Sequence, residues 1–171
     1  MQKLFLAIVV NLLGVFPAAA VAATMAVAEI INTDQQVIGK ATLQQAPTGI
    51  LIYFEASGLS PGPHAIHLHG VGKCEPNFKA AKGHIDPHKR QHGLLNPDGP
   101  ERGDLPNLFV AADGTVKAEF FTTLVSLKSG TAALLDGDGS ALVIHANPDD
   151  HMTQPIGGAG GRIACGVIKV M

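Results

Sequence analysis

The sequence of 171 residues has no tryptophan, one tyrosine, two cysteines and only 15% charged residues. Its lysines and arginines are scattered rather than clustered, and no ladder of aromatic residues accompanies them, which argues against a nucleic-acid-binding surface. Beyond the first residues, no segment is long and apolar enough to cross a bilayer. Internal repeats, linker-like tracts and convincing amphipathic helices are also absent. We therefore expect one β-rich domain with no nucleic-acid partner and no stable membrane anchor.

The N-terminal segment has the three parts of a secretory signal peptide. It starts with Met1-Gln2-Lys3, continues as an apolar run to about Phe16, and ends in small residues with an A-x-A-type cleavage site near Ala22 and Ala23. The apolar run is shorter than the ~20 residues that a spanning helix requires, so an export signal is favoured over a membrane anchor. The sequence thus predicts a signal peptide at 1–22, a single domain at 23–171, and an exported protein, periplasmic or extracellular.

Short segments rich in β-branched and aromatic residues, separated by turn residues, follow from Met25 onward. Two long stretches of glycine, proline and charge, about 71–106 and 147–161, fit neither a helix nor a strand and are expected to be loops. Short strands at this spacing, without a helix, favour an all-β sandwich or barrel. The expected strands are 25–31, 37–43, 50–56, 64–69, 108–111, 116–123, 141–145 and 162–170.

The first loop concentrates histidines and carboxylates. His84, His88 and His92 lie in a segment of glycine, proline and charge that runs on to Asp104. Imidazole and carboxylate groups held by turn residues are suitable ligands for a borderline divalent metal. The sequence therefore predicts a metal site in this loop.

Further histidines lie on the expected strands. His67 and His69 are two residues apart, so their side chains leave the same face of a strand. His145 ends another strand and could join them. His64 has the opposite parity, and we expect it to be a hydrogen-bonded structural histidine.

The two cysteines, Cys74 and Cys165, are far apart in the sequence. In an exported protein they most simply form one disulfide. Their spacing fits neither a CxxC redox motif nor a thiolate metal site.

Five segments resemble copper/zinc superoxide dismutases of the exported bacterial type, in that family's order and approximate spacing. The resemblance spans nearly the whole mature chain. It implies an eight-stranded Greek-key β-barrel or sandwich with long metal-binding and electrostatic loops. It also implies an enzyme that converts superoxide to dioxygen and hydrogen peroxide, with one copper and one zinc per subunit. The segments are GPHAIHLHG (62–70), GHIDP (83–87), GDL (103–105), ALVIH (141–145) and GGRIACGVI (160–168).

The resemblance also implies a role for each matching residue. Arg162 would guide the superoxide anion, His84 would carry a proton, and Asp149 would link the two metal sites. Cys74 and Cys165 would form the disulfide that pins the metal loop to the barrel. A homodimer is left open. The implied copper ligands are His67, His69, His84 and His145, and the implied zinc ligands are His84, His92 and Asp104.

One position departs from the family pattern, because Glu101 stands three residues before Asp104, where the family has a third zinc-binding histidine. Three interpretations are open. Glu101 is itself a zinc ligand, since a carboxylate oxygen can bind zinc. Alternatively His88 or His151 takes its place, which only loop flexibility would favour. In the third interpretation the zinc site is weak or empty and Glu101 pairs with Arg102 or another base.

An alternative function for the whole chain is a non-catalytic copper-binding or copper-delivery protein on the same scaffold, because fold does not fix function. A purely structural Greek-key domain would leave the clustered histidines unexplained.

Overall fold

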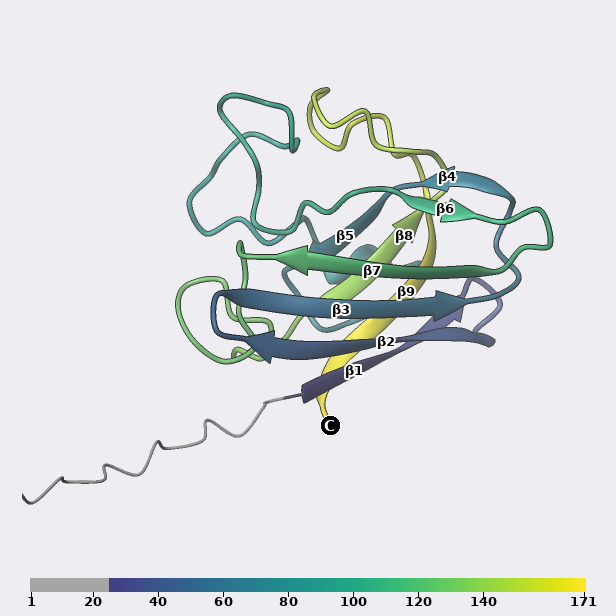
Figure 1. Cartoon of the computed structure of the whole chain (residues 1–171), viewed down its shortest axis with the longest axis horizontal. Helices are drawn as coiled ribbons and strands as arrows, with labels where there is room; N and C mark the ends of the chain where they lie inside the picture. The colour runs from purple at the N-terminus through teal and green to yellow at the C-terminus, as the bar shows by residue number, and fades with distance from the viewer. Residues whose placement is uncertain (1–24) are drawn as a thin grey trace, which may run out of the picture.

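The computed structural model describes residues 25–171, so the expected signal peptide lies outside the described residues. Almost all regular structure in this range is strand (Figure 1). The elements are β1 (Met25–Asn32), β2 (Val37–Ala46), β3 (Gly49–Ala56), β4 (Gly62–His64), β5 (Ile66–His69), the short 3-10 turn η1 (Lys79–Ala81), β6 (Leu108–Val110), β7 (Val116–Thr122), β8 (Ala141–His145) and β9 (Arg162–Val170).

The expected strand 64–69 is interrupted at Ala65. Here the chain changes partners, since β4 pairs with β6 while β5 pairs with β8. The backbone of Ala65 instead donates to Asn147 O and accepts from His145 N. With β4 and β5 counted as one interrupted strand, the eight expected strands are present. Both expected loops are also found, one between β5 and β6 and one between β8 and β9.

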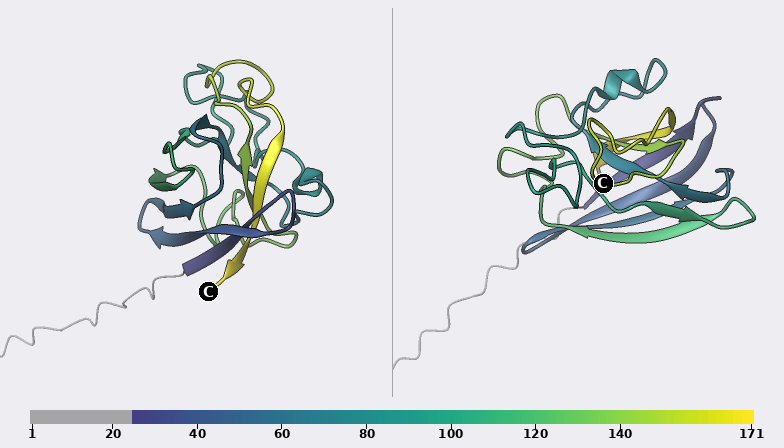
Figure 2. Two further views of the ribbon diagram at one scale, coloured as in Figure 1. Left: turned by 90° about the vertical axis from the view of Figure 1, so that its right-hand side faces the viewer. Right: turned by 90° about the horizontal axis from the view of Figure 1, so that it is seen from above.

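Seven strands form one antiparallel sheet in the order β5-β8-β9-β1-β2-β3-β7, and β4 and β6 form a separate pair. The large sheet curls about β1, so that β5, β8 and β9 lie across from β2, β3 and β7 (Figure 2). Curling brings the apolar faces of the two halves together, as strand twist favours. The all-β Greek-key fold class is confirmed.

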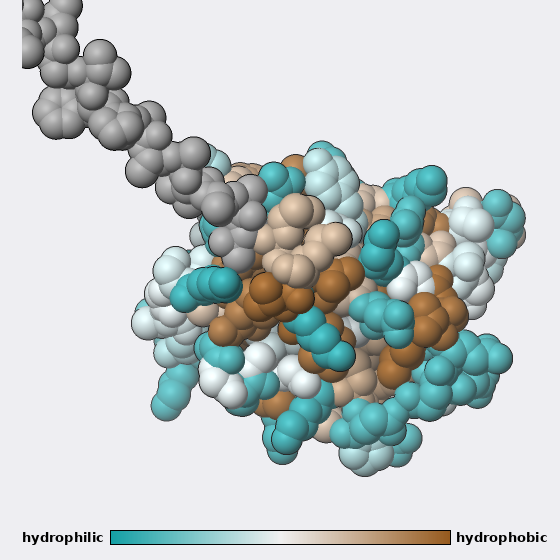
Figure 3. Space-filling model, turned by 90° about the horizontal axis from the view of Figure 1, so that it is seen from below, coloured by the Kyte–Doolittle hydropathy of each residue, from teal (hydrophilic) through white to brown (hydrophobic). Residues whose placement is uncertain are grey.

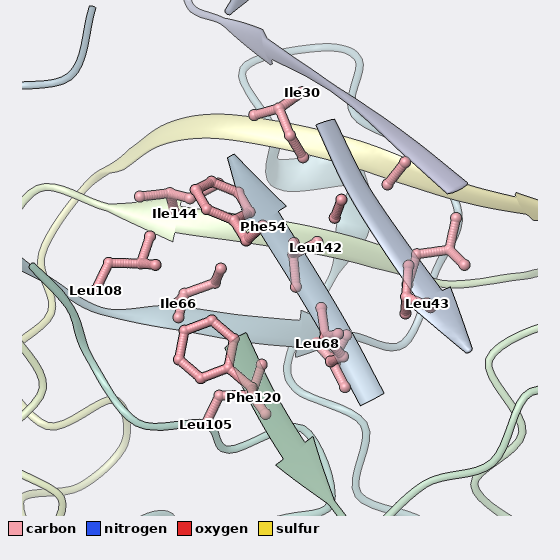
Figure 4. Packing of buried hydrophobic residues seen from close by; sticks show 14 of the residues in the cluster. Ile30, Leu43, Phe54, Ile66, Leu68, Leu105, Leu108, Phe120, Leu142 and Ile144 are labelled. Atoms are coloured by element: carbon pink, nitrogen blue, oxygen red, sulfur yellow. The ribbon is translucent and has the colours of Figure 1, made fainter. Parts of the chain in front are cut away.

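Alternation along the strands builds the core between these halves. On β3, Ile50, Ile52, Phe54 and Ala56 are buried, while Tyr53 and Glu55, which alternate with the last three, face solvent. Full burial of one such apolar side chain stabilises the fold by about 1.5–3 kcal/mol. Figure 4 shows how side chains from both halves of the sheet meet. Those labelled are Ile30, Leu43, Phe54, Ile66, Leu68, Leu105, Leu108, Phe120, Leu142 and Ile144.

Strands β5 and β8 are buried on both faces. Ile66 and Leu68 enter the main core, so the alternate residues His67 and His69 leave on the opposite face. A second apolar cluster lies beside them and attaches the first loop to the sheet. It consists of Cys74, Phe78, Ala81, Ala141, Val143 and Cys165. Cys74 and Cys165 form the expected disulfide, which ties this loop to β9.

The outer surface of β1, β2 and β9 carries a groove of about 790 Å³ next to the disulfide, with Val27, Ile31, Val37 and Val167 among its walls. Figure 3 looks onto the molecule from the side on which β1 lies, and hydrophobic side chains gather in one region of that view. Across residues 25–171, no helix has the length and apolarity needed to span a membrane.

Candidate metal centre

Four histidines converge on the outer face of β5 and β8. One ring nitrogen from each lies within 4.8 Å of the others, which is close enough for one metal ion. His67 and His69 come from β5, and His145 comes from the end of β8. His84 comes from the first loop and pairs with His69 through an isolated β-bridge. These are the four residues that the sequence analysis expected at the copper.

The backbone around β5 explains how the loop reaches the sheet. Ile85 N donates to Leu68 O, and Leu68 N donates to Gly103 O, at 3.0 and 2.8 Å. The segments that carry His84 and Asp104 are therefore attached to the same strand. A Cβ atom at Gly103 would lie 2.1 Å from Leu68 O, so only glycine allows this approach.

Each sheet histidine has one nitrogen occupied and one left over. His69 Nδ1 lies 2.9 Å from Lys82 O, His145 Nδ1 lies 3.3 Å from Gly160 O, and His67 Nε2 lies 2.8 Å from Asp149 Oδ2. The remaining nitrogens, His67 Nδ1, His69 Nε2, His84 Nε2 and His145 Nε2, are buried and have no hydrogen-bond partner. Buried polar atoms are normally satisfied. Four unsatisfied imidazole nitrogens facing one point are the donor set that copper binds.

Burial keeps the sheet histidines in the neutral form that binds a metal. Desolvation, only partly opposed by the hydrogen bond to Asp149, lowers the pKa of His67 to about 4. Desolvation and the neighbouring His67 lower the pKa of His145 to about 3. Desolvation followed by the nearby His84 also holds the pKa of His69 well below its usual value.

A second group adjoins the first and shares His84. It consists of His67, His84, His92 and Asp104, whose ligand atoms again lie within 4.8 Å of one another. Asp104 Oδ1 lies 3.1 Å from His84 Nδ1 and 2.9 Å from His92 Nδ1. Asp104 Oδ2 accepts hydrogen bonds from the backbone of Gly93 and Glu101, which fixes the carboxylate.

Glu101 enters the second group from the same turn. Its Oε2 lies 2.6 Å from His84 Nδ1 and 3.6 Å from His92 Nδ1. The Glu101 side chain is 20% exposed, while those of His84 and His92 are almost fully buried. Carboxylate oxygens of both Glu101 and Asp104 thus lie close to the Nδ1 atoms of His84 and His92.

In this second group the pKa values of His84 and His92 are raised, whereas those of the sheet histidines are lowered. Burial opposes the charged form of His92, but hydrogen bonds to Asp104, Asp149 and Glu101 outweigh it and raise its pKa to about 11. The pKa of His84 is also raised, because hydrogen bonds to Asp104 and Glu101 outweigh burial. Although burial works in the opposite direction, hydrogen bonds to these two histidines lower the pKa of Glu101 and of Asp104.

Asp149 joins the two groups. Its Oδ2 lies 2.8 Å from His67 Nε2, and its Oδ1 lies 3.0 Å from His92 Nε2. Gly157 passes so close that a Cβ atom there would lie 1.7 Å from Asp149 Oδ1, and its φ of +59° also favours glycine. The second glycine-rich loop therefore packs directly on the bridging carboxylate.

Two supporting residues were missed by sequence reasoning. Gln154 accepts a hydrogen bond from His92 N at 3.0 Å and donates one to His92 O at 2.8 Å. Asn107 accepts from Asp149 N and donates to Asp149 O, both at 2.8 Å. These partners are 62 and 42 residues apart in the sequence, and no local signal relates them.

Three residues weighed for the second group lie elsewhere. His88 is exposed, and its Nε2 lies 3.4 Å from Thr131 Oγ1. His151 contacts Asn107 and lies 3.6 Å from Asp149, and neither histidine belongs to a metal-binding group of the described chain. Arg102 forms no ion pair with Glu101 and instead approaches Leu124 O at 3.4 Å.

His64 hydrogen-bonds to the backbone of His145 and Ser60, as expected of a structural histidine.

Arg162 lies at the start of β9, paired with His145 across the strands. Its guanidinium donates to the carbonyl oxygens of Phe78 and Lys82, in the loop that the disulfide anchors. Lys82 O also lies 2.9 Å from His69 Nδ1, so the arginine and one histidine of the four-histidine group share one carbonyl. A fixed positive charge therefore lies next to the four-histidine group.

A Greek-key β-barrel whose strands and loops gather two adjoining sets of imidazole and carboxylate groups has the donor arrangement of a binuclear metalloprotein. The chain belongs to the copper/zinc superoxide dismutase family, whose model matches residues 37–168. It is 56% identical over 140 residues to a Cu-Zn superoxide dismutase of Caulobacter vibrioides, covering 80% of each chain. It is 49% identical over 145 residues to Cu-Zn superoxide dismutase 1 of Aquifex aeolicus, covering 83% of this chain and 86% of the relative.

Solved structures agree with the sequence relatives. A superoxide dismutase-like protein of Bacillus subtilis superposes with a TM-score of 0.79 at 36% identity, over 82% of this chain and 96% of that one.

Proposed function

We propose that this protein is a superoxide dismutase, a copper-dependent oxidoreductase with one copper and one zinc site per subunit. The observation that carries the proposal is the set of four buried imidazole nitrogens without partners, next to the guanidinium of Arg162. Family membership supports it, because the relatives matched over most of this chain bear the dismutase name.

The donor atoms divide into two sets. Copper would be held by His67 Nδ1, His69 Nε2, His84 Nε2 and His145 Nε2. Zinc would be held by His84 Nδ1, His92 Nδ1, Asp104 Oδ1 and Glu101 Oε2. When bound, copper supplies the one-electron oxidation and reduction by which two superoxide anions and two protons become dioxygen and hydrogen peroxide.

The chain's own groups bring the anion and the proton. Arg162 attracts superoxide toward the histidines, and its two carbonyl partners hold it in place. His84 Nε2 can hold either copper or a proton, and when it is free of the metal it would deliver one of the two protons, while Nδ1 stays against carboxylates on the other side of the ring. The second proton comes from solvent. Asp149 orients His67 and His92 from behind, so the two sites keep their relative position.

Glu101 completes the zinc site in place of a histidine. Its oxygen meets the Nδ1 atoms of His84 and His92, and with Asp104 it provides two negative charges that match the charge of Zn²⁺. This arrangement favours ligation by Glu101 over pairing with Arg102, whose guanidinium approaches Leu124 O instead.

The second candidate, a copper-binding or copper-delivery protein, is favoured only by the altered position at Glu101. Superoxide turnover by the purified, copper-loaded mature protein separates the two functions. An enzyme removes many equivalents of superoxide per copper, whereas a carrier consumes about one equivalent and stops. Copper bound at the histidines without turnover would establish the carrier function.

Export belongs to the same proposal. Residues 1–22 would be removed, and the domain 23–171 would act in the periplasm or outside the cell. The disulfide between Cys74 and Cys165 supports an oxidising compartment. N-terminal sequencing of protein from separated cell fractions tests the cleavage site near Ala22 and Ala23. Sedimentation of the mature protein would check the homodimer that the sequence leaves open.

A further inference from the structure

A polar pocket of about 330 Å³ lies where the turn between β2 and β3, the loop after β7 and Arg102 meet. Volumes of this size hold small molecules. None of its lining residues belongs to the two metal-binding groups. The residues that matter for its chemistry are Arg102 and the hydroxyl-bearing Thr48, Thr123, Ser126, Ser129 and Thr131.

Arg102 is the only charged residue in the lining. Its Nε atom is buried and has no hydrogen-bond partner, and Nη1 makes only a long contact of 3.4 Å with Leu124 O. No carboxylate of the described residues lies within ion-pair distance of this guanidinium, even though Glu101 is its neighbour in the sequence. Arg102 as a whole is half-buried, but a buried N–H donor without an acceptor is unfavourable, so an acceptor from outside the chain is expected at Nε.

The turn that carries Arg102 sets its direction. Glu101 N donates to Asp104 Oδ2, and Asp104 N donates to Glu101 O, which closes a tight turn. Glu101 and Asp104 both face the histidines, whereas Arg102, between them, lines the pocket with Leu124. The Arg102 side chain therefore lines the pocket and does not belong to the metal-binding groups.

The remaining walls supply donors and no competing negative charge. Neither aspartate nor glutamate lines the pocket, and five hydroxyl-bearing residues line it together with the arginine. Outside the lining, His88 Nε2 lies 3.4 Å from Oγ1 of the lining residue Thr131. A planar guanidinium fork with hydroxyl groups around it is suited to a tetrahedral oxyanion.

We propose that this pocket is an oxyanion-binding site, with phosphate or a small phosphate ester as its ligand and Arg102 as its anchor. The site is independent of the dismutase reaction and requires no metal in the pocket.

Nuclear magnetic resonance titration of the metal-loaded protein, with its copper reduced, tests the proposal at constant ionic strength. Inorganic phosphate and glycerol 3-phosphate are the two probes. Backbone amides of Ser129, Gly130 and Thr131 report on the pocket, and the amide of Phe78 reports separately on anion binding at Arg162.

We expect saturable chemical-shift changes at the pocket amides. Arg102→Gln should raise the dissociation constant about tenfold, as for the loss of one charge-assisted contact. Lys117→Gln, which removes an exposed cation of β7 that is not in the lining, should leave it unchanged. Tighter binding of the ester would identify an organic phosphate as the ligand, and equal binding would identify the free ion.

Thr131→Val serves as a second variant if Arg102→Gln fails to fold, and it should weaken binding severalfold while leaving the shifts near Arg162 intact. The proposal is overturned if the pocket amides show no saturable shift with either probe. It is also overturned if the folded variants bind both probes as tightly as the wild type.

Discussion

Replacing Glu101 by glutamine should remove zinc selectively. The change keeps the size of the side chain but replaces the oxygen that lies 2.6 Å from His84 Nδ1 and 3.6 Å from His92 Nδ1 by a neutral amide. Loss of a residue that merely supports a ligand lowers metal affinity about 10–100-fold, and loss of a direct ligand should do at least as much. In free energy this is about 1.4–2.7 kcal/mol or more.

Copper content should be almost unchanged, because none of the four nitrogens of the copper site contacts Glu101. Zinc affinity is measured by competition with a chromophoric chelator, and copper content by elemental analysis of the same sample. Glu101→His is the matched control, since it installs the family's usual ligand and should retain zinc. Wild-type zinc affinity in Glu101→Gln would refute ligation by Glu101. Zinc well below one equivalent in the wild type, raised by Glu101→His, would instead establish a weak site.

Three further predictions concern the charge beside the site, the disulfide and pH. Arg162→Gln should lower the second-order rate constant with superoxide roughly tenfold at low salt and flatten its dependence on ionic strength, and an unchanged rate in stopped flow would contradict the steering role. Replacing both Cys74 and Cys165 by serine should destabilise the protein by about 4–5 kcal/mol, because the disulfide spans 91 residues, and chemical unfolding that shows less than about 1 kcal/mol would refute this estimate. In the metal-free protein His92 has a pKa of about 11 and is protonated at neutral pH, so zinc must displace a proton and its affinity should fall as pH drops from about 8 to 6. The pKa values of about 4 for His67 and about 3 for His145 mean that these ligands are already neutral, so their contribution to copper binding should be constant over the same range, which calorimetry in buffers of different ionisation enthalpy would check.

The strand pattern predicted the fold because alternation marks which residues meet the core. The same alternation in the sequence predicted that His67 and His69 share one face of their strand, opposite Ile66 and Leu68. The break at Ala65 could not be predicted in this way. It follows from the exchange of pairing partners between β6 and β8, which are distant in the sequence.

The residues of the two histidine-rich groups could be expected from the family resemblance, because most of them lie in the short motifs that carry it, although His92 does not. Their supports could not, since Gln154 holds His92 and Asn107 holds Asp149 across long stretches of chain. The direction of Arg102 was equally hidden, because neighbours in a tight turn can point to opposite sides. Sequence motifs therefore identified the side chains that the structure brings together but not those that fix their geometry.

The most direct measurement of the central claim is the catalytic rate of superoxide decay as copper is added to the zinc-loaded, copper-free protein. Pulse radiolysis gives the rate at each copper level, and electron paramagnetic resonance shows whether nitrogen ligands hold the added copper. The account predicts that the rate rises in proportion to copper and stops rising at one equivalent per chain, where the four-histidine site is full. Copper bound through nitrogen at one equivalent, with superoxide decaying no faster than without protein, would contradict it.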